Sequence, residues 1–326
     1  MKTVPPELLG FLSRYQTYIL AGHREPDGDC IGSILALSSF LLRKGKKTIL
    51  LSSGPFKRPE IKKYESLFKS AIDPEEMGDG TAVVVIDCSN IDRVGDAAKG
   101  LDRFPQAIID HHATNDSDHE YAFVDGTAPA TTLLIQSIIE ASGDTPTHDE
   151  ANFLLFGLCT DTGFFRHLDD KSAPAFEHTA RLVRAGANPK KTFACMNSGK
   201  SFGSRILISR ILSRMKPYYG GRLIVSYETI EDTEEHGLEG RDSDSIYQLI
   251  QSVAGVEAIV LVRQETESRC SVGFRSLDRV DVSKVASAFG GGGHRQASGL
   301  SIEGLIDDLI PRFVSAFGDQ FPGIDP

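Results

Sequence analysis

The sequence contains no tryptophan, only five cysteines and no long hydrophobic run. Because five is an odd number and no two of these cysteines form a CxxC pair, a complete disulfide framework is excluded. The longest apolar stretches, such as residues 34–42, fall far short of the roughly 20 residues that a membrane-spanning helix needs. We therefore expect buried free thiols in a reducing compartment and no membrane segment.

Clusters of basic residues are missing as well. The chain has 35 Lys and Arg against 45 Asp and Glu, which gives a formal net charge of −10. A protein that holds a long duplex needs a broad basic surface, because neutralisation of phosphates dominates such binding. The composition therefore argues against a long duplex nucleic acid as partner. A small phosphorylated substrate stays compatible with it, provided that metal cations supply the local positive charge.

The first ten residues contain Pro5 and Pro6 and lack the apolar core of a secretory signal. Together with the free thiols, this favours a cytoplasmic location. The sequence leaves the oligomeric state open, including whether the chain forms a homodimer.

The length of 326 residues favours two domains, at roughly 100–200 residues each. In the N-terminal part, short strand-like runs alternate with helical patterns. These runs are apolar throughout, as in a parallel sheet that is buried on both faces. We expect an α/β fold: a domain over 1–190 with a mainly parallel sheet flanked by helices, a helical connector over 191–215, and a smaller α/β domain with a mixed sheet over 216–326.

The pattern predicts the individual elements as follows. Strands are expected at 18–21, 48–51, 81–86, 107–109, 223–225, 258–263 and 269–274. Helices are expected at 32–42, 59–68, 130–141, 150–159, 173–185, 245–253, 282–288 and 305–317.

Acidic and imidazole side chains stand where predicted core elements end. Since the carboxyl ends of parallel strands face one crevice, we expect these side chains to converge. Three clusters follow predicted strands and one ends an apolar helix. They are His23 with Asp27 and Asp29, then Asp87, then Asp110 with His111 and His112, and finally Asp161.

Carboxylates that meet in a cleft repel one another and raise each other's pKa unless cations neutralise them. Mixed His and Asp ligands suit Mn²⁺ or a similar ion. Each residue also has an ordinary structural interpretation: Asp87 could cap a helix, and Asp27 and Asp29 could be turn residues around Gly28. Because the pattern recurs after successive core elements, the combination favours a metal site.

These His and Asp clusters resemble the four motifs of the DHH phosphoesterases. In the C-terminal part of the chain, Gly290–Gly293 followed by His294 resembles the signature of their DHH-associated C-terminal domain. The segments 274–276 and 281–283, taken with the glycine run and His294, are similar to the nano-RNase branch of that family. These motifs occur in the expected order over about residues 20–300, which is nearly the whole chain.

The resemblance implies two divalent metal ions, most simply Mn²⁺, with Mg²⁺ and Co²⁺ as alternatives. Asp110 would orient a histidine, and His112 would face the scissile phosphate. A metal-activated water would be the nucleophile, so no Ser or Cys nucleophile is needed. By this resemblance, one ion is held by His23, Asp27 and Asp87, and the other by Asp29, Asp87, His111 and Asp161.

The glycine run in the C-terminal domain is expected to bind an anion. Glycines let backbone N–H groups approach a phosphate closely. Gly291, Gly292, Gly293 and His294 would then contact substrate phosphate, and Arg275 would contact a phosphate or the 3′ end. Taken alone, the run could equally be a flexible linker and Arg275 a surface charge.

The implied activity is hydrolysis of short oligoribonucleotides, of 3′-phosphoadenosine 5′-phosphate, or of both. Cleavage of linear di-AMP from cyclic di-AMP turnover is an alternative. A pyrophosphatase or exopolyphosphatase would share the metal motifs, but the basic SRKKQ-like cluster of the related pyrophosphatases is not found. A RecJ-like exonuclease for long single strands and a nucleotide-binding sensor without turnover are the remaining alternatives.

Overall fold

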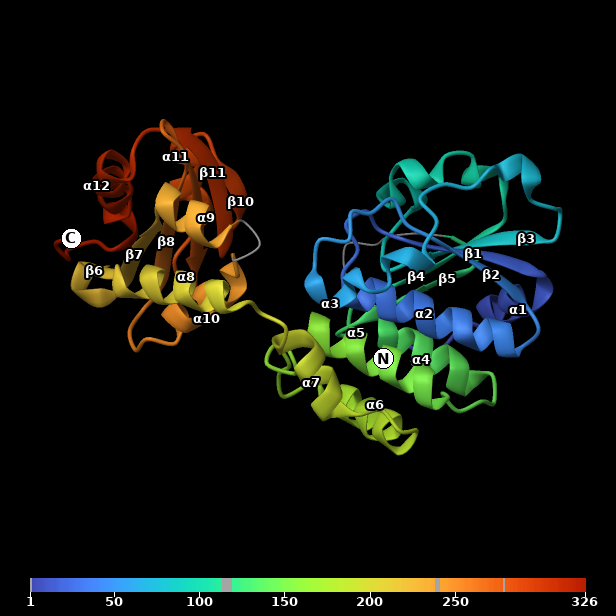
Figure 1. Cartoon of the computed structure of the whole chain (residues 1–326). Helices are drawn as coiled ribbons and strands as arrows, with labels where there is room; N and C mark the ends of the chain where they lie inside the picture. Colours follow the sequence, from blue (N-terminus) through green and yellow to red (C-terminus); the bar gives the residue numbers. More distant parts are fainter. Residues whose placement is uncertain (1, 113–118, 238–240, 278) are drawn as a thin grey trace. The chain divides into compact units, whose positions relative to one another are not determined.

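The computed structural model describes residues 2–112, 119–237, 241–277 and 279–326. The chain divides into two compact units, Met1–Ser198 and Gly199–Pro326, and each contains its own sheet (Figure 1). The expected α/β class is confirmed. The domain limits inferred from sequence stay a prediction. Among the helices of the described residues, none combines the length and the apolarity needed to cross a membrane.

The first unit is a five-stranded parallel sheet in the order β2-β1-β3-β4-β5, as predicted for this half of the chain. The strands are β1 (Thr17–Gly22), β2 (Lys47–Leu51), β3 (Thr81–Ile86), β4 (Gln106–Asp110) and β5 (Ala122–Val124). The helices are α1 (Pro6–Arg14), α2 (Gly28–Arg43), α3 (Pro59–Lys62), α4 (Thr131–Ala141), α5 (His148–Asp161), α6 (Ala173–Arg184) and α7 (Pro189–Asn197).

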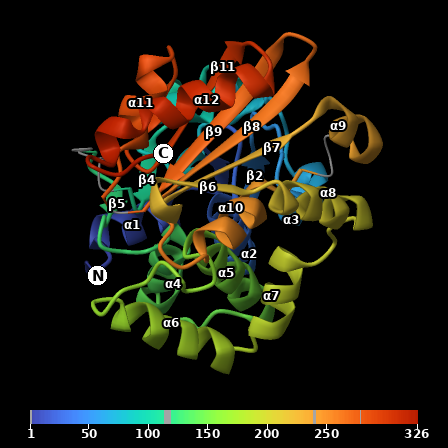
Figure 2. The same ribbon diagram turned by 90° about the vertical axis from the view of Figure 1, so that its left-hand side faces the viewer.

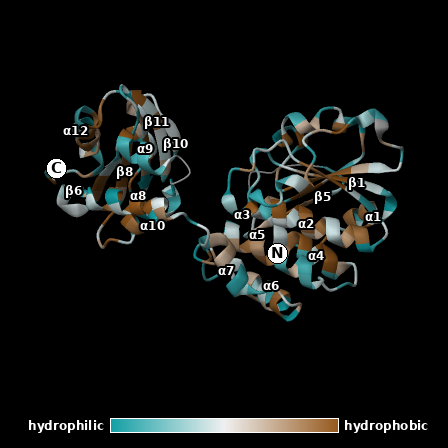
Figure 3. Cartoon of the chain, viewed as in Figure 1, coloured by the Kyte–Doolittle hydropathy of each residue, from teal (hydrophilic) through white to brown (hydrophobic). Residues whose placement is uncertain are grey.

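The central strand β3 is buried on both faces. Val84 and Ile86 pack toward α1, α2, α4 and α5, whereas Val83 and Val85 pack against the short 3₁₀ turns that follow the strand. Figure 3 shows the hydrophobic colour concentrated on the strands of this sheet and on the adjoining helices. Burial of each such side chain contributes about 1.5–3 kcal/mol, so this uninterrupted apolar run stabilises a two-sided core.

Helices α2 and α5 cross closely because glycines stand at their contact. A Cβ atom on Gly32 would lie 2.6 Å from the carbonyl oxygen of Phe153, and one on Gly157 would lie 3.0 Å from the Cα of Asp29. No larger side chain fits at either position without displacing a helix. The close crossing brings the N-terminal end of α2 alongside the C-terminal end of α5, which carries Asp161.

The second unit is a six-stranded mixed sheet in the order β10-β11-β9-β8-β7-β6, which confirms the predicted mixed sheet. Only β7 and β8 are parallel. The strands are β6 (Lys216–Tyr218), β7 (Leu223–Glu228), β8 (Ala258–Thr266), β9 (Arg269–Ser276), β10 (Gly292–His294) and β11 (Ala297–Glu303). The helices are α8 (Phe202–Ser213), α9 (Ile230–His236), α10 (Ser243–Gln251), α11 (Val282–Ala288) and α12 (Ile306–Ala316).

Helices cover both faces of this second sheet. Alternate residues of β7 and β8 pack against α11 and α12 on one face and against α8 and α10 on the other. Figure 2 shows α11 and α12 on the opposite side of β7, β8 and β9 from α10. α8, which falls in the predicted connector, therefore forms part of the core of the second unit.

One predicted helix, at 59–68, is wrong. The structure forms the short helix α3 and then a separate 3₁₀ turn at Glu65–Leu67. Phe68 is extended, and Lys69 donates its N–H to the Leu50 carbonyl beside β2. Pairing with the sheet therefore overrides the local helical preference. The strands β5, β6, β10 and β11 and the helices α1 and α9 were not predicted, because they are short or rich in polar residues and glycine.

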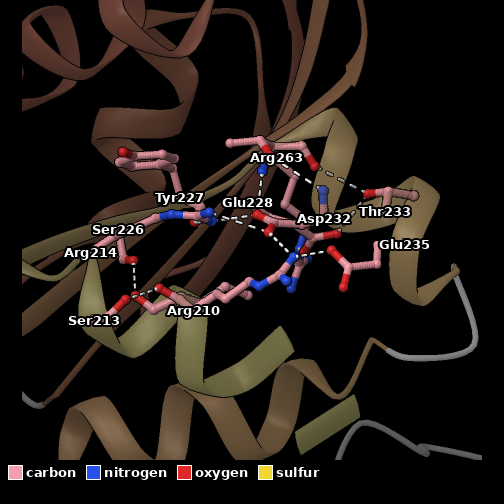
Figure 4. A network of polar contacts seen from close by, with 12 residues as sticks. Arg210, Ser213, Arg214, Ser226, Tyr227, Glu228, Asp232, Thr233, Glu235 and Arg263 are labelled. Carbon is pink, nitrogen blue, oxygen red and sulfur yellow. Dashed lines mark hydrogen bonds and ion pairs between the residues drawn. The ribbon is translucent and has the colours of Figure 1, made fainter. Parts of the chain in front are cut away.

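A network of charged side chains holds α9 in the second unit (Figure 4). Glu228, fully buried at the end of β7, accepts hydrogen bonds from Arg241 at 2.6 Å and from Arg263 at 2.9 Å. Asp232 on α9 is buried and forms an ion pair with Arg214. Because each buried carboxylate has a guanidinium partner, neither charge is left uncompensated.

Glu228→Gln should destabilise the second unit by about 3 kcal/mol, since it removes the buried charge that partners the partly buried guanidinium groups of Arg241 and Arg263. Glu265→Gln is the matched control, because Glu265 also pairs with Arg241 but is 31% exposed. Loss of an exposed ion pair costs at most about 1 kcal/mol. Urea unfolding followed by circular dichroism measures both changes. Equal losses of stability for the two variants would contradict the stated importance of burial.

Candidate metal centre

Asp87 lies at the centre of the predicted cluster, directly after β3 (Figure 1). Its backbone has a φ angle of 60°, a conformation that residues other than glycine rarely adopt. The N–H of Asp87 donates to the Ile109 carbonyl at 2.9 Å, so pairing with β4 fixes the turn. Backbone strain of this kind concentrates at functional sites, and here it directs a carboxylate that is 2% exposed into the edge of the sheet.

The two carboxylate oxygens of Asp87 face two different histidines. Oδ1 lies 3.7 Å from Nε2 of His111, and Oδ2 lies 3.5 Å from Nε2 of His23. Both separations are too long for a hydrogen bond. They suit ligands of a shared ion, because atoms bound about 2.1 Å from one cation lie roughly 3–3.5 Å from each other. One carboxylate thus stands between two imidazole groups, with His23 on one side and His111 on the other.

His23 and Asp27 complete the group on one side of Asp87. Nε2 of His23 lies 3.9 Å from Oδ1 of Asp27, and Nδ1 lies 2.9 Å from the Arg24 carbonyl. The carbonyl contact holds the ring so that Nε2 faces the carboxylates. Burial lowers the pKa of His23, but the neighbouring carboxylates of Asp27 and Asp87 favour the protonated ring, outweigh burial and raise the pKa to about 10. In the metal-free protein, the proton on His23 therefore supplies positive charge beside Asp27 and Asp87.

His111 and Asp161 form the group on the other side, together with Asp29. Nε2 of His111 lies 3.3 Å from Oδ2 of Asp161 and 3.9 Å from Oδ2 of Asp29. Nδ1 of His111 lies 3.2 Å from the Ala128 carbonyl, which can only accept a hydrogen bond. Nδ1 therefore carries the proton, and the lone pair of Nε2 points toward the carboxylates.

The N-terminus of α4 holds two of these carboxylates in place. Thr131 and Thr132 donate their backbone N–H groups to the fully buried Asp29 at 2.6 and 3.0 Å. The hydroxyl of Thr131 also donates to Oδ1 of Asp87 at 2.8 Å. The positive end of the helix favours carboxylate charge at this position. Sequence reasoning missed this contribution, for which the only signal was a pair of threonines at the start of a predicted helix.

The charges of the site call for bound cations. Burial raises the pKa of Asp29 well above its ordinary value, and repulsion from Asp87 adds to the shift. Burial likewise raises the pKa of Asp161 to about 6, although His111 opposes the shift. Within the described ranges, neither Lys nor Arg forms an ion pair with Asp27 or with these three carboxylates. This set of oxygen and imidazole donors is largely buried and forms no ion pair with a described Lys or Arg, and it fits divalent metal ions.

A cavity of about 200 Å³ opens at these residues. Its lining also includes His112 and Arg93, and Arg93 was not predicted as a site residue. Asp110 is fully buried and lies 2.7 Å from Nδ1 of His112, so it is His112 that Asp110 orients. That hydrogen bond raises the pKa of His112.

The thiol of Cys30 lies behind the cavity, within 4.8 Å of ligand atoms of His23 and Asp87. Cys30 is fully buried, and burial raises its pKa well above the ordinary value, which keeps the thiol protonated. A Cβ atom on Gly22 would lie 2.1 Å from its sulfur. The side chain therefore fills the space over Gly22, as expected of a packing residue.

In the second unit the sheet register aligns two predicted substrate contacts. Ala297 on β11 is opposite Arg275 on β9 and also opposite His294 on β10. Residues directly opposite each other in antiparallel strands point to the same face. Arg275 and His294 therefore lie on one face, separated by the small Ala297. The guanidinium of Arg275 stacks over the ring of Tyr247, 4.6 Å from its centre.

The glycine run ends α11 and begins β10. Gly290 and Gly291 donate their N–H groups to carbonyls of the last turn of α11, at 3.1 and 2.9 Å. The N–H of Gly291 is therefore already used within the fold. Gly293 has a φ angle of 138°, and a Cβ atom there would lie 2.6 Å from the Ala297 carbonyl oxygen. Gly292 has open space around it.

Residues 17–158 match the DHH family, N-terminal domain, and residues 220–321 match the DHHA1 domain. The chain is 30% identical to the bifunctional oligoribonuclease and PAP phosphatase NrnA of Thermus thermophilus, over 92% of this chain and 89% of that protein. Identity to the Bacillus subtilis protein of the same name is 26%, over 93% of each. An exopolyphosphatase-related protein from Bacteroides fragilis has the same fold, with a TM-score of 0.80 and 21% identity over 99% of this chain and 98% of that chain.

Thr131→Val should weaken Mn²⁺ binding about 10–100-fold, because it removes the hydroxyl that orients Asp87 while keeping the volume of the side chain. Thr132→Val is the matched control, since the buried hydroxyl of Thr132 has no partner among the described residues. Titration with Mn²⁺ followed by electron paramagnetic resonance measures both affinities. Equal affinities for the two variants would contradict the role given to the Thr131 hydroxyl.

Mn²⁺ affinity should fall more steeply with decreasing pH below about 6. With a raised pKa of about 6, the Asp161 carboxyl of the metal-free protein is ionised at pH 7.5 and protonated at pH 5. A binding ion must then displace this proton, which costs about tenfold in apparent affinity per pH unit. The same Mn²⁺ titration at pH 5, 6 and 7.5 measures the slope. A slope that does not change near pH 6 would contradict the raised pKa of Asp161 as the source of the effect.

Proposed function

The chain belongs to the DHH family of phosphoesterases, and on this basis we propose that it hydrolyses short oligoribonucleotides and 3′-phosphoadenosine 5′-phosphate with the help of two divalent metal ions. Mn²⁺ is the first choice of ion, with Mg²⁺ and Co²⁺ as alternatives. The observation that carries the proposal is the placement of Asp87, whose two oxygens face His111 and His23 separately.

Each ion has its own set of ligands, and the two sets share Asp87. When bound, such a pair activates a water for in-line attack and neutralises charge on the phosphoryl oxygens. The helix N-terminus at Thr131 and the Ala128 carbonyl orient these ligands from behind. One ion would be held by His23, Asp27 and Asp87, and the other by Asp29, Asp87, His111 and Asp161.

His112 acts on the scissile phosphate from the wall of the cavity. Asp110 holds Nδ1 of His112, which leaves Nε2 to face a substrate. Because that hydrogen bond raises the pKa of His112, the imidazole is more readily protonated than a free one. Nε2 then donates a proton to the leaving oxygen. Asp110 is a positioning residue in this scheme.

In the second unit, the predicted substrate contacts lie on β9, β10 and the glycine run. Arg275 and His294 share one face of the sheet, and the open space at Gly292 lets a phosphate approach the backbone closely. Gly291 shapes this segment through its contact with α11. The small cavity and the net charge of −10 favour short substrates over long polyanions. The two activities named for the 30% identical relative also support the proposal.

Hydrolysis rates of the Mn²⁺-loaded protein on a panel of substrates test this function. The panel consists of a 5′-labelled ribodinucleotide, 3′-phosphoadenosine 5′-phosphate, linear di-AMP, pyrophosphate and a 20-nucleotide RNA. We expect turnover of the first two and little of the last two. Asp87→Asn should abolish turnover, because it removes the shared ligand, whereas the control variant of the exposed Asp102, Asp102→Asn, should behave like the wild type.

Other outcomes point to the alternatives. Faster cleavage of pyrophosphate would indicate a pyrophosphatase, and preferential cleavage of linear di-AMP would place the chain in cyclic di-AMP turnover. Equal rates on the 20-nucleotide RNA would indicate a RecJ-like exonuclease. Tight nucleotide binding without any hydrolysis in Mn²⁺, Mg²⁺ or Co²⁺ would indicate a sensor.

A further inference from the structure

Arg93 is the cavity residue to which the proposed function gives no task. Of the residues that line the cavity within the described ranges, the other six serve as metal ligands or face the phosphate. A guanidinium carries only hydrogen-bond donors and stays protonated, so Arg93 cannot bind a metal ion. Its presence among carboxylates and imidazoles therefore needs a separate explanation.

The backbone of Arg93 is fixed at both ends. Its N–H donates to Oδ1 of Asn90 at 3.3 Å, and its carbonyl accepts the N–H of Arg24 at 2.8 Å. The next residue, Val94, is fully buried in the core beside β3. These contacts tie Arg93 to the segments that carry His23 and Asp87. The exposed side chain thus extends from an anchored base.

The guanidinium of Arg93 forms no ion pair with any of the described carboxylates. Of the ion pairs formed between described residues, none involves Arg93, although Asp27, Asp87 and Asp161 line the same cavity. Among the described residues, the guanidinium of Arg93 therefore lies at the cavity without an ion pair.

A count of charges shows why the site needs such a cation. Asp27, Asp29, Asp87 and Asp161 bring four negative charges, which two divalent cations cancel. A phosphodiester adds one more negative charge, and further charge develops on its oxygens during the attack. The charges of the two ions and the four carboxylates therefore sum to zero, and they do not neutralise the negative charge of the bound phosphate. A planar guanidinium meets this need, because its fork of donors matches two phosphate oxygens.

We propose that Arg93 binds the non-bridging oxygens of the phosphate being cleaved and thereby forms the anion site of the first unit. The ligand class is a phosphate monoester or diester. The assignment rests on the proposed function and adds to it a phosphate contact that does not depend on the second unit.

The test uses the full-length Mn²⁺-loaded protein and the variants Arg93→Gln, Arg93→Ala and Arg93→Lys. Arg103→Ala is the matched control, because Arg103 is exposed in the same unit and does not line the cavity. Inorganic phosphate binding is measured by calorimetry, Mn²⁺ affinity by paramagnetic resonance, and kcat/KM on the ribodinucleotide by product release. Activity is also measured with guanidinium ion added.

Arg93→Gln should bind phosphate about tenfold or more weakly, since a charge-assisted hydrogen bond is lost. Its kcat/KM should fall about 10²–10³-fold, as for removal of a donor to developing negative charge. Arg93→Lys should lie between Arg93→Gln and the wild type, and guanidinium ion should restore part of the activity of Arg93→Ala. Mn²⁺ affinity should stay unchanged in all three, and Arg103→Ala should match the wild type throughout.

Unchanged phosphate binding in Arg93→Gln would overturn the assignment, whatever the activity. A parallel loss of Mn²⁺ affinity would also overturn it, because Arg93 would then act on the metal site. If the wild-type protein cleaves none of the substrates, the proposed function itself is contradicted. The phosphate titration still gives a result in that case, so the two failures are distinguishable.

Discussion

Electrostatic repulsion among carboxylates is the constraint on which the first unit depends. Asp29 and Asp87 are almost completely buried, and Asp27 and Asp161 stand beside them at one edge of the sheet. Such a cluster is costly without positive charge between its members, as the raised pKa values of Asp29 and Asp161 indicate. A protein that needed only stability would replace these acids with apolar residues. Their retention in a packed core points to bound cations as part of the working molecule.

The scaffold around the cluster is organised to hold these charges. Close packing of α2 on α5 through Gly32 and Gly157 brings the two helix ends together, and the N-terminus of α4 supplies N–H donors to Asp29. The strained turn at Asp87 is stabilised by pairing with β4. Three kinds of interaction, namely helix packing, a helix terminus and a sheet hydrogen bond, thus act on the same few carboxylates. Rigidity of this kind lowers the reorganisation needed when a substrate binds.

The sequence was sufficient to predict the α/β class and the convergence of residues at the strand ends, because the rule for parallel sheets connects chain order to spatial position. His23, Asp87 and His111 are therefore found together as expected. Thr131 and Arg93 were not predicted, because threonine and arginine are common on any protein surface. Only their positions in the folded chain distinguish them from other threonines and arginines. The missed strand β10 shows a related limit, since its pairing with β11 overrides the weak strand preference of glycine.

The central carboxylate has a consequence for the order of metal loading. One oxygen of Asp87 faces each histidine. A metal ion bound on one side would therefore change the charge and the mobility of the carboxylate that also serves the other side. Such a pair of sites is thermodynamically linked, and by reciprocity each ion alters the affinity of its neighbour by the same factor. In the proposed two-ion mechanism, the protein would then respond to the supply of metal as a coupled unit, with a half-loaded form whose population is set by the sign of that linkage.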